Sequence, residues 1–130
     1  MVEIIAVIVI MGILSASTVG IVINMREDSF AERLLLAHNL RYARRLSLDS
    51  TSDWGIRFSG NTYTLTENGS PSGSFPSTGS RSHTSNATLP SGLGSIVFNQ
   101  QKGTLVASSA QIITFENGAR INVYTTGCIQ

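Results

Sequence analysis

The first feature of the chain is a continuous apolar run. Twenty residues, from Ile4 to Ile23, contain no charged side chain, and a single carboxylate, Glu3, stands directly before them. At about 1.5 Å per residue, a helix of this length spans about 30 Å, which matches the hydrocarbon core of a bilayer. The run is longer than the apolar region of a cleaved signal peptide and too long for a core helix of so small a domain. We therefore expect residues 1–24 to form the membrane-spanning half of a helix.

After Asn24, polar and apolar residues alternate at helical spacing. Neither Pro nor Gly occurs in residues 21–50, so the pattern predicts one helix from about residue 2 to about residue 50. The apolar positions of its second half recur every three or four residues, at Phe30, Leu34, Ala37, Leu40, Ala43 and Leu46. Such a stripe predicts a face that packs on the rest of the domain.

From Trp54 onward the period of the pattern becomes two, which is typical of strands. Six short runs rich in aromatic and β-branched residues are predicted as strands, at residues 54–58, 62–66, 95–98, 103–107, 111–115 and 119–124. The first two form a hairpin across a short turn, and the links are too short for parallel crossovers. We therefore predict an α+β fold, with the long N-terminal helix packed on an antiparallel sheet and Trp54 in the core where helix and sheet meet.

Residues 68–94 lie between the second and third predicted strands, and 21 of these 27 residues are Ser, Thr, Gly, Pro or Asn. This composition is too polar to supply a core, so we predict an exposed loop. Residues 25–130 would then form one soluble domain that includes the loop.

The stretch VEIIAVIVIMGILSA resembles the N-terminal segment of type IV pilins and of type II secretion pseudopilins, whose mature chains commonly begin Phe-Thr-Leu-Val-Glu. Met1 takes the Leu position, Val2 and Glu3 match Val-Glu, and Gly12 matches a frequent helix glycine. The resemblance implies that a prepilin peptidase removes a short basic leader and that the new N-terminus is methylated. It also implies that two mature residues precede Met1.

The same resemblance implies a role for Glu3. In pilin filaments the corresponding acid meets the N-terminal amine of a neighbouring subunit. An unpaired carboxylate away from water costs several kcal/mol, so a cation offered by a partner chain is strongly preferred. Glu3 is thus expected to set the register of assembly, and the apolar side chains that pack in the filament are Ile4, Ile5, Val7, Ile8, Ile10 and Ile13. The expected partners are other pilin or pseudopilin subunits, the bacterial inner membrane, and the peptidase before assembly.

The only cluster of basic residues lies in the second half of the predicted helix. Arg33, Arg41, Arg44 and Arg45 share this stretch with the acids Glu27, Asp28, Glu32 and Asp49. We interpret the stretch as a mixed-charge face and its arginines as candidate contacts with partner subunits. A patch for nucleic acid or anionic lipid is the less favoured alternative, because nine Lys and Arg residues against eight Asp and Glu residues give a net charge of only +1.

The C-terminal end, GARINVYTTGCIQ, resembles the GspH/FimT group of minor pseudopilins. The branch of that group that binds DNA during natural transformation carries a Gly-Arg-x-Arg motif. The matching residues here, 127–130, contain neither arginine, which counts against DNA uptake because phosphate contacts need Lys or Arg. A minor pilin of the mannose-sensitive haemagglutinin type also fits these features. Membership in either group implies a periplasmic domain anchored in the inner membrane and a place in a surface pilus or periplasmic pseudopilus.

Nothing in the chain has the spacing of a catalytic or metal site. His38 and His83 are 45 positions apart, and the single cysteine, Cys128, has no histidine near it in sequence. We expect no enzyme activity and no cofactor, His38 at a surface or interface, and Cys128 buried as a small core residue. A plain single-span anchor that carries a binding domain remains an alternative to the filament subunit.

Overall fold

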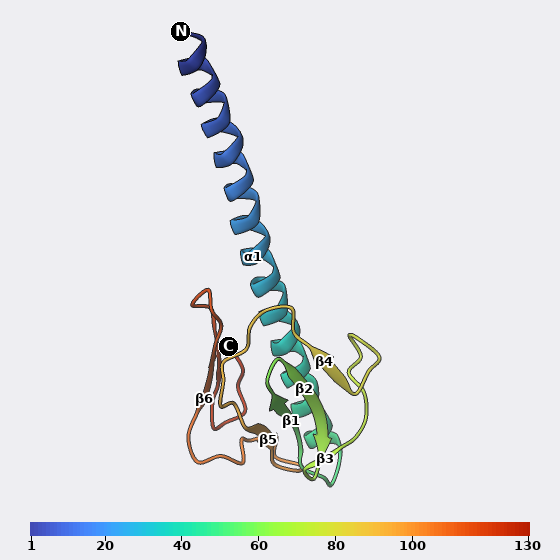
Figure 1. Ribbon diagram of the computed structural model, residues 1–130. Helices are drawn as coiled ribbons and strands as arrows, with labels where there is room; N and C mark the ends of the chain where they lie inside the picture. The colour runs from blue at the N-terminus through green and yellow to red at the C-terminus, as the bar shows by residue number, and fades with distance from the viewer.

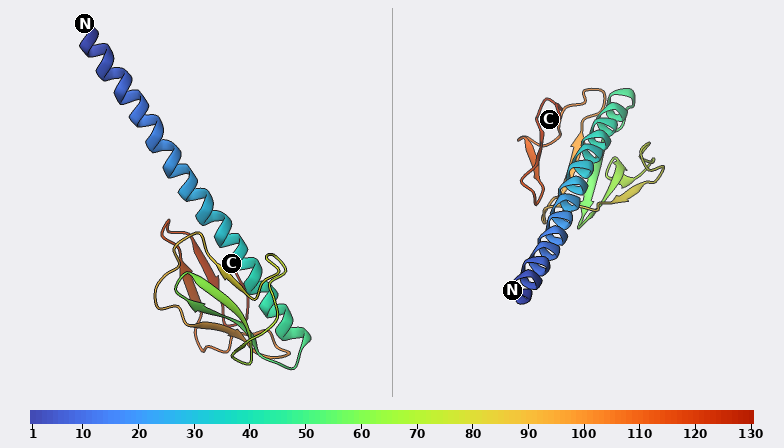
Figure 2. Two further views of the ribbon diagram at one scale, coloured as in Figure 1. Left: turned by 45° about the vertical axis from the view of Figure 1, so that its right-hand side comes forward. Right: turned by 90° about the horizontal axis from the view of Figure 1, so that it is seen from above.

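A computed structural model of the chain describes the backbone of residues 1–130 and the side chains of residues 1–15 and 29–130. One helix, α1 (Val2–Asp49), runs through 48 residues and is therefore about 70 Å long. Its first half projects away from the rest of the molecule, and its second half lies along the β domain (Figures 1 and 2). The helix ends at Ser50, whose backbone is extended and whose hydroxyl accepts a hydrogen bond from Trp54 Nε1 at 2.9 Å. The predicted single helix is confirmed.

The strands form two antiparallel sheets instead of one. The first sheet has the order β3-β2-β1-β5, with β4 also paired to β2, and the second consists of β6 and β7. The bounds of the strands are β1 (Trp54–Ser59), β2 (Thr62–Glu67), β3 (Ser70–Pro71), β4 (Ser82–Thr84), β5 (Ser95–Phe98), β6 (Gln111–Thr114) and β7 (Arg120–Val123). The β1–β2 hairpin and the strands β5, β6 and β7 confirm five of the six predicted strands.

The sixth predicted strand, residues 103–107, is not a regular strand. Val106 donates its N–H to the Val97 carbonyl in β5 at 2.9 Å, whereas Leu105 donates its N–H to the Thr125 carbonyl at 3.0 Å. Because the segment divides its backbone hydrogen bonds between two neighbours, it forms no ladder with either. It instead connects β5 to the C-terminal residues.

The Ser- and Gly-rich residues 68–94 are more ordered than their composition predicts. The short strands β3 and β4 lie within them, and hydroxyl pairs at 3.1 Å and 2.9 Å join β4 to β2. The prediction that this segment supplies no core is wrong at three positions, because Phe75, Ala87 and Leu89 are buried. Most of the remaining side chains of the segment are exposed.

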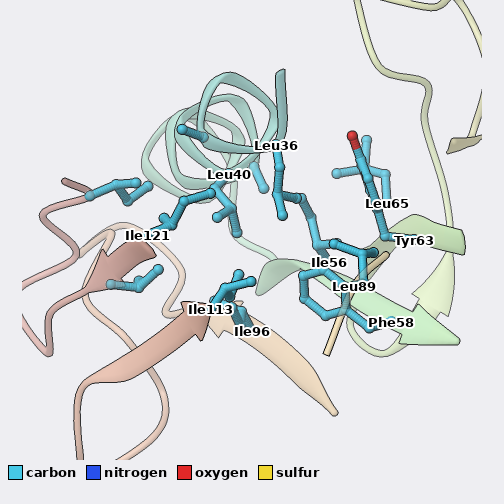
Figure 3. Close-up of a cluster of buried hydrophobic side chains, with 14 of the residues drawn as sticks. Leu36, Leu40, Ile56, Phe58, Tyr63, Leu65, Leu89, Ile96, Ile113 and Ile121 are labelled. Carbon is cyan, nitrogen blue, oxygen red and sulfur yellow. The ribbon is translucent and has the colours of Figure 1, made fainter. Parts of the chain in front are cut away.

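Side chains from α1 and from both sheets meet in one hydrophobic core (Figure 3). Leu36 and Leu40 of α1 point towards Ile56 of β1 on one side and Ile121 of β7 on the other. Trp54 is buried at the junction of helix and sheet, as predicted. Since α1 spans both sheets, it holds the two parts of the β domain together.

The stripe of α1 that enters the core differs from the predicted one. Ala37, Leu40 and Ala43 are buried as expected and Leu46 is partly buried, but Phe30 and Leu34 are 54% and 51% exposed. The buried positions 36, 40, 43 and 47 are spaced by three or four residues, and two of them, Leu36 and Ser47, are absent from the predicted stripe. The run of three leucines at positions 34–36 allows more than one apolar stripe, and the neighbouring strands determine which of them is buried.

Candidate assembly surface

The described side chains of residues 4–14 make this part of α1 apolar on all of its sides. The six side chains predicted to pack in a filament are each between 55% and 65% exposed: Ile4, Ile5, Val7, Ile8, Ile10 and Ile13. Successive helix positions are rotated by about 100°, so these residues cover the full circumference. A helix that is hydrophobic all round is stable when lipid or other protein surrounds it. Each of these side chains contributes about 1.5–3 kcal/mol when it is fully buried.

Glu3 lies in the first turn of α1, and its side chain is exposed. A carboxylate in this position is stabilised by the partial positive charge of the helix N-terminus. Among the residues whose side chains are described, no cation forms an ion pair with Glu3. Its carboxylate is thus accessible at the tip of the projecting helix.

The apolar run predicted to span a membrane continues through residues 16–23, whose side chains lie outside the described part of the structure. No helix within the described residues is long and apolar enough to cross a membrane. The acids Glu27 and Asp28, which the sequence places in a mixed-charge face, also lie outside the described side chains.

Two of the four candidate contact arginines hold the domain together. The Nη2 atom of Arg41 donates a hydrogen bond to the Ile129 carbonyl at 3.2 Å. The Nε atom of Arg44 donates to the Gly103 carbonyl at 3.0 Å. Both acceptors lie far along the chain from α1, so these two charged donors attach the residues around Gly103 and the C-terminal residues to the helix.

The other two arginines, Arg33 and Arg45, face outward. The guanidinium carbon of Arg33 lies 5.2 Å from the centre of the Phe30 ring, which is a cation–π distance. Arg45 forms an exposed ion pair with Asp49 one turn away, at 3.7 Å, and exposed pairs of this kind contribute little to stability. The structure therefore does not bring the four arginines together into one patch.

The arrangement of helix and sheets resembles that of a known filament protein. Two crystal forms of the type IV minor pilin FimU from Pseudomonas aeruginosa match the chain. The first has a TM-score of 0.63 at 18% identity and covers 81% of this chain and 88% of that chain. The second has a TM-score of 0.57 at 19% identity and covers 77% and 89%.

The chain has the fold of a type IV minor pilin. Neither a protein-family model nor a curated protein matches the sequence. The α+β fold predicted from the long helix and the strand periodicity is confirmed, and so is the pilin-like fold that the resemblance of the N-terminal segment implies.

Within the minor pilin fold, α1 carries a buried acid that no pattern in the sequence indicates. The sequence predicts Glu32 on a mixed-charge face, but its side chain is only 5% exposed. Its Oε1 atom accepts the N–H of Asn86 at 3.1 Å, and both of its oxygens lie 3.3 Å from Nε2 of His83. The expectation of a mixed-charge face is therefore wrong at Glu32, because residues 83–86 cover this acid.

A second polar contact lies two turns further along α1, at Asn39. Its side chain is fully buried and donates from Nδ2 to the hydroxyl oxygen of Tyr63 at 3.1 Å, while Oδ1 accepts from the Ser77 hydroxyl at 3.0 Å. Burial, together with the charge of Glu32, raises the pKa of Tyr63 to about 12, although the bond from Asn39 acts in the opposite direction. Glu32 and Asn39 thus attach residues 77–86 to α1 at two points.

The position of Cys128 also differs from the expectation. Its side chain is exposed, whereas the flanking residues Gly127 and Ile129 are buried. Residues 125–127 form a turn, after which Ile129 is bridged to Val123 of β7 and faces the core, so its neighbours Cys128 and Gln130 face the solvent. His38 is exposed on α1, at the surface as predicted.

Proposed function

We propose that the chain is a minor type IV pilin or pseudopilin, a structural subunit that joins or primes a filament through the projecting half of α1. One observation carries the proposal: a helix that exposes apolar side chains all round extends from a domain with the minor pilin fold. No isolated domain in water gains from such a helix, whereas a bundle of similar helices buries it. The function is assembly, and the partners are other pilin subunits.

Within this assembly, Glu3 sets the register between neighbouring subunits. Its carboxylate is exposed at the helix tip in the single chain, and it leaves water when the apolar residues around it pack. A buried carboxylate without a cation costs several kcal/mol, so only an arrangement that supplies a partner amine is stable. Apolar contacts alone allow one helix to shift along its neighbour, whereas an ion pair at Glu3 is formed in only one position.

Before assembly, we propose that the projecting half anchors the subunit in the inner membrane with its domain in the periplasm. A prepilin peptidase then exposes the amine that the partner subunit uses. This proposal is supported by the uncharged run from Ile4 to Ile23 and by the likeness of residues 1–16 to pilin N-termini.

Replacing Glu3 by alanine tests the register contact. In cells that express the full-length chain, Glu3→Ala should reach the membrane at the normal level but be lost from sheared filaments. Glu116→Ala is the matched control, because it removes an exposed acid in the turn after β6, remote from the helix tip. Filaments that incorporate the Glu3→Ala subunit as well as the control would refute the role of Glu3.

The N-terminus of the native protein tests the processing step. Mass spectrometry of the protein from its own membranes should find two residues before Met1, the first of them carrying a methyl group. A native chain that begins at Met1 would remove the basis for pairing Glu3 with a neighbouring amine, and it would favour the plain membrane anchor.

A further inference from the structure

A groove of about 180 Å³ lies between the exposed side of α1 and the strand β7. Its lining includes the apolar residues Leu34 and Ile121 and three arginines, Arg33, Arg41 and Arg120. Arg33 and Arg41 are two helical turns apart on one side of α1, and Arg120 approaches from the first position of β7. Helix and sheet together therefore place three arginines around one small groove.

These charges are not neutralised within the groove. Its lining contains no acidic side chain, and among the described residues no carboxylate forms an ion pair with any of the three arginines. Glu32, adjacent in sequence to Arg33, is buried against His83 on another side of α1. Within the described residues, the groove thus holds three cationic side chains with no acidic side chain beside them, in a chain whose net charge is only +1.

Two of the arginines are held in place before any ligand arrives. Arg41 is fixed by the bond from Nη2 to the Ile129 carbonyl at 3.2 Å, which leaves its other donors available. Arg33 is held above the Phe30 ring. Preorganised guanidinium groups bind planar anions with two parallel hydrogen bonds and lose little side-chain entropy on doing so.

We propose that this groove binds a carboxylate side chain of a neighbouring filament subunit. The inference rests on the proposed function. The occupant follows from charge complementarity and from continuity with the assembly surface, because the exposed Leu34 and Phe30 lead from the groove towards the projecting half of α1. A subunit that packs on that half also covers the groove, and an acidic side chain placed there would meet three arginines that form no ion pair within the described residues.

The same cations attract phosphate, but the site is poorly suited to a nucleic acid. Strong binding to a duplex needs a row of phosphate contacts, whereas this groove is short and the chain carries nearly equal numbers of acidic and basic residues. We therefore favour the carboxylate and treat nucleic acid as an outcome of the test.

The first experiment reverses the charge of Arg120, an exposed residue whose side chain forms no hydrogen bond or ion pair within the described part of the structure. Arg120→Glu should lower the amount of subunit in sheared filaments by about tenfold or more, relative to its membrane level, as expected for the loss of a desolvated charge pair. Arg81→Glu is the matched control, because it makes the same change at an exposed arginine outside the groove, and it should stay within about twofold of wild type.

Folding is checked by thermal unfolding of the purified full-length variants, which should match wild type. Arg120→Gln, which removes the charge without reversing it, should also reduce incorporation. Normal incorporation of both Arg120 variants would overturn the proposal. Absence of the wild-type chain from filaments would instead contradict the proposed function, so the two failures are distinguishable.

The occupant is identified by a photo-crosslinking amino acid at Leu34, which is half exposed at the edge of the groove. We expect crosslinks to a peptide of another subunit that contains Asp or Glu, and an arginine at that acid should restore incorporation of Arg120→Glu. Crosslinks only to a peptide without an acid would overturn the proposal. A mobility shift of a short DNA duplex that Arg120→Glu abolishes would likewise overturn it, because it would identify phosphate as the ligand.

Discussion

The hydrogen bond between Asn39 and Tyr63 provides a direct test of how α1 is attached to the first sheet. Tyr63→Phe removes the hydroxyl and keeps the ring, whose centre lies 6.0 Å from that of Phe58 and 5.5 Å from that of Phe75. Both Asn39 and Tyr63 are fully buried, so Nδ2 loses its acceptor at 3.1 Å where water has no access. Leaving one buried donor unpaired should lower the free energy of unfolding by about 1–3 kcal/mol.

The measurement is urea unfolding of the full-length chain in detergent, followed by the fluorescence of Trp54, the single tryptophan. Tyr124→Phe is the control, because this tyrosine is 40% exposed and its hydroxyl lies 3.5 Å from Oε1 of Gln130. The control should cost less than about 0.5 kcal/mol. If Tyr63→Phe costs no more than Tyr124→Phe, the buried amide is satisfied in some other way and the attachment of α1 through Asn39 is wrong.

Three further predictions follow from single residues. Gly127→Ala should lower the free energy of unfolding by more than about 2 kcal/mol, because φ is +83° and the added Cβ would lie 1.9 Å from the Gly103 carbonyl oxygen. Gly118→Ala is the control, because Gly118 has φ +81° but lies in open space. It should lower the free energy of unfolding only by the backbone penalty of about 1–2 kcal/mol. The pKa of Tyr63 is raised to about 12, so its hydroxyl stays protonated in the folded state at pH values where an unfolded tyrosine has ionised. The free energy of unfolding of wild type, relative to that of Tyr63→Phe, should therefore be largest below about pH 10 and decrease as the pH rises further. A difference that stays constant between about pH 9 and pH 11.5 would contradict this assignment. The exposed Cys128 should react with a thiol reagent in the native chain, and protection until denaturant is added would show that it is covered.

The elements that the sequence predicts well are those with a local signal. The helix bounds follow from an uninterrupted helical pattern, and the β1–β2 hairpin follows from two β-branched and aromatic runs around a turn. The strand β4 lacks such a signal, because polar pairs such as the hydroxyls of Thr64 and Ser82, at 2.9 Å, join it to β2. A hydrophobic pattern cannot reveal a strand whose cross-strand pairs are polar.

The roles of the polar residues on α1 depend on partners far along the chain. Glu32 is buried because His83 and Asn86, 51 and 54 positions later, contact its carboxylate. Arg44 is structural because it donates a hydrogen bond to the carbonyl of Gly103, 59 positions later. In sequence, both residues look like ordinary charges on a helix surface. Only the fold shows which charges are used within the domain and which remain available to a partner.

This division of the charges constrains how a subunit would be placed in a filament. Glu3 and Arg41 lie on the same continuous helix and are separated by 38 positions, or about 57 Å along its axis. A contact at Glu3 fixes the position of the helix along its axis but leaves rotation about that axis free, since the apolar side chains around it are alike on every side. A contact at the groove prevents this rotation, because the groove lined by Arg33, Arg41 and Arg120 lies on one side of α1. Loss of the Glu3 contact should therefore prevent entry into the filament, whereas loss of the groove contact should leave subunits that enter but are rotated incorrectly and are readily lost.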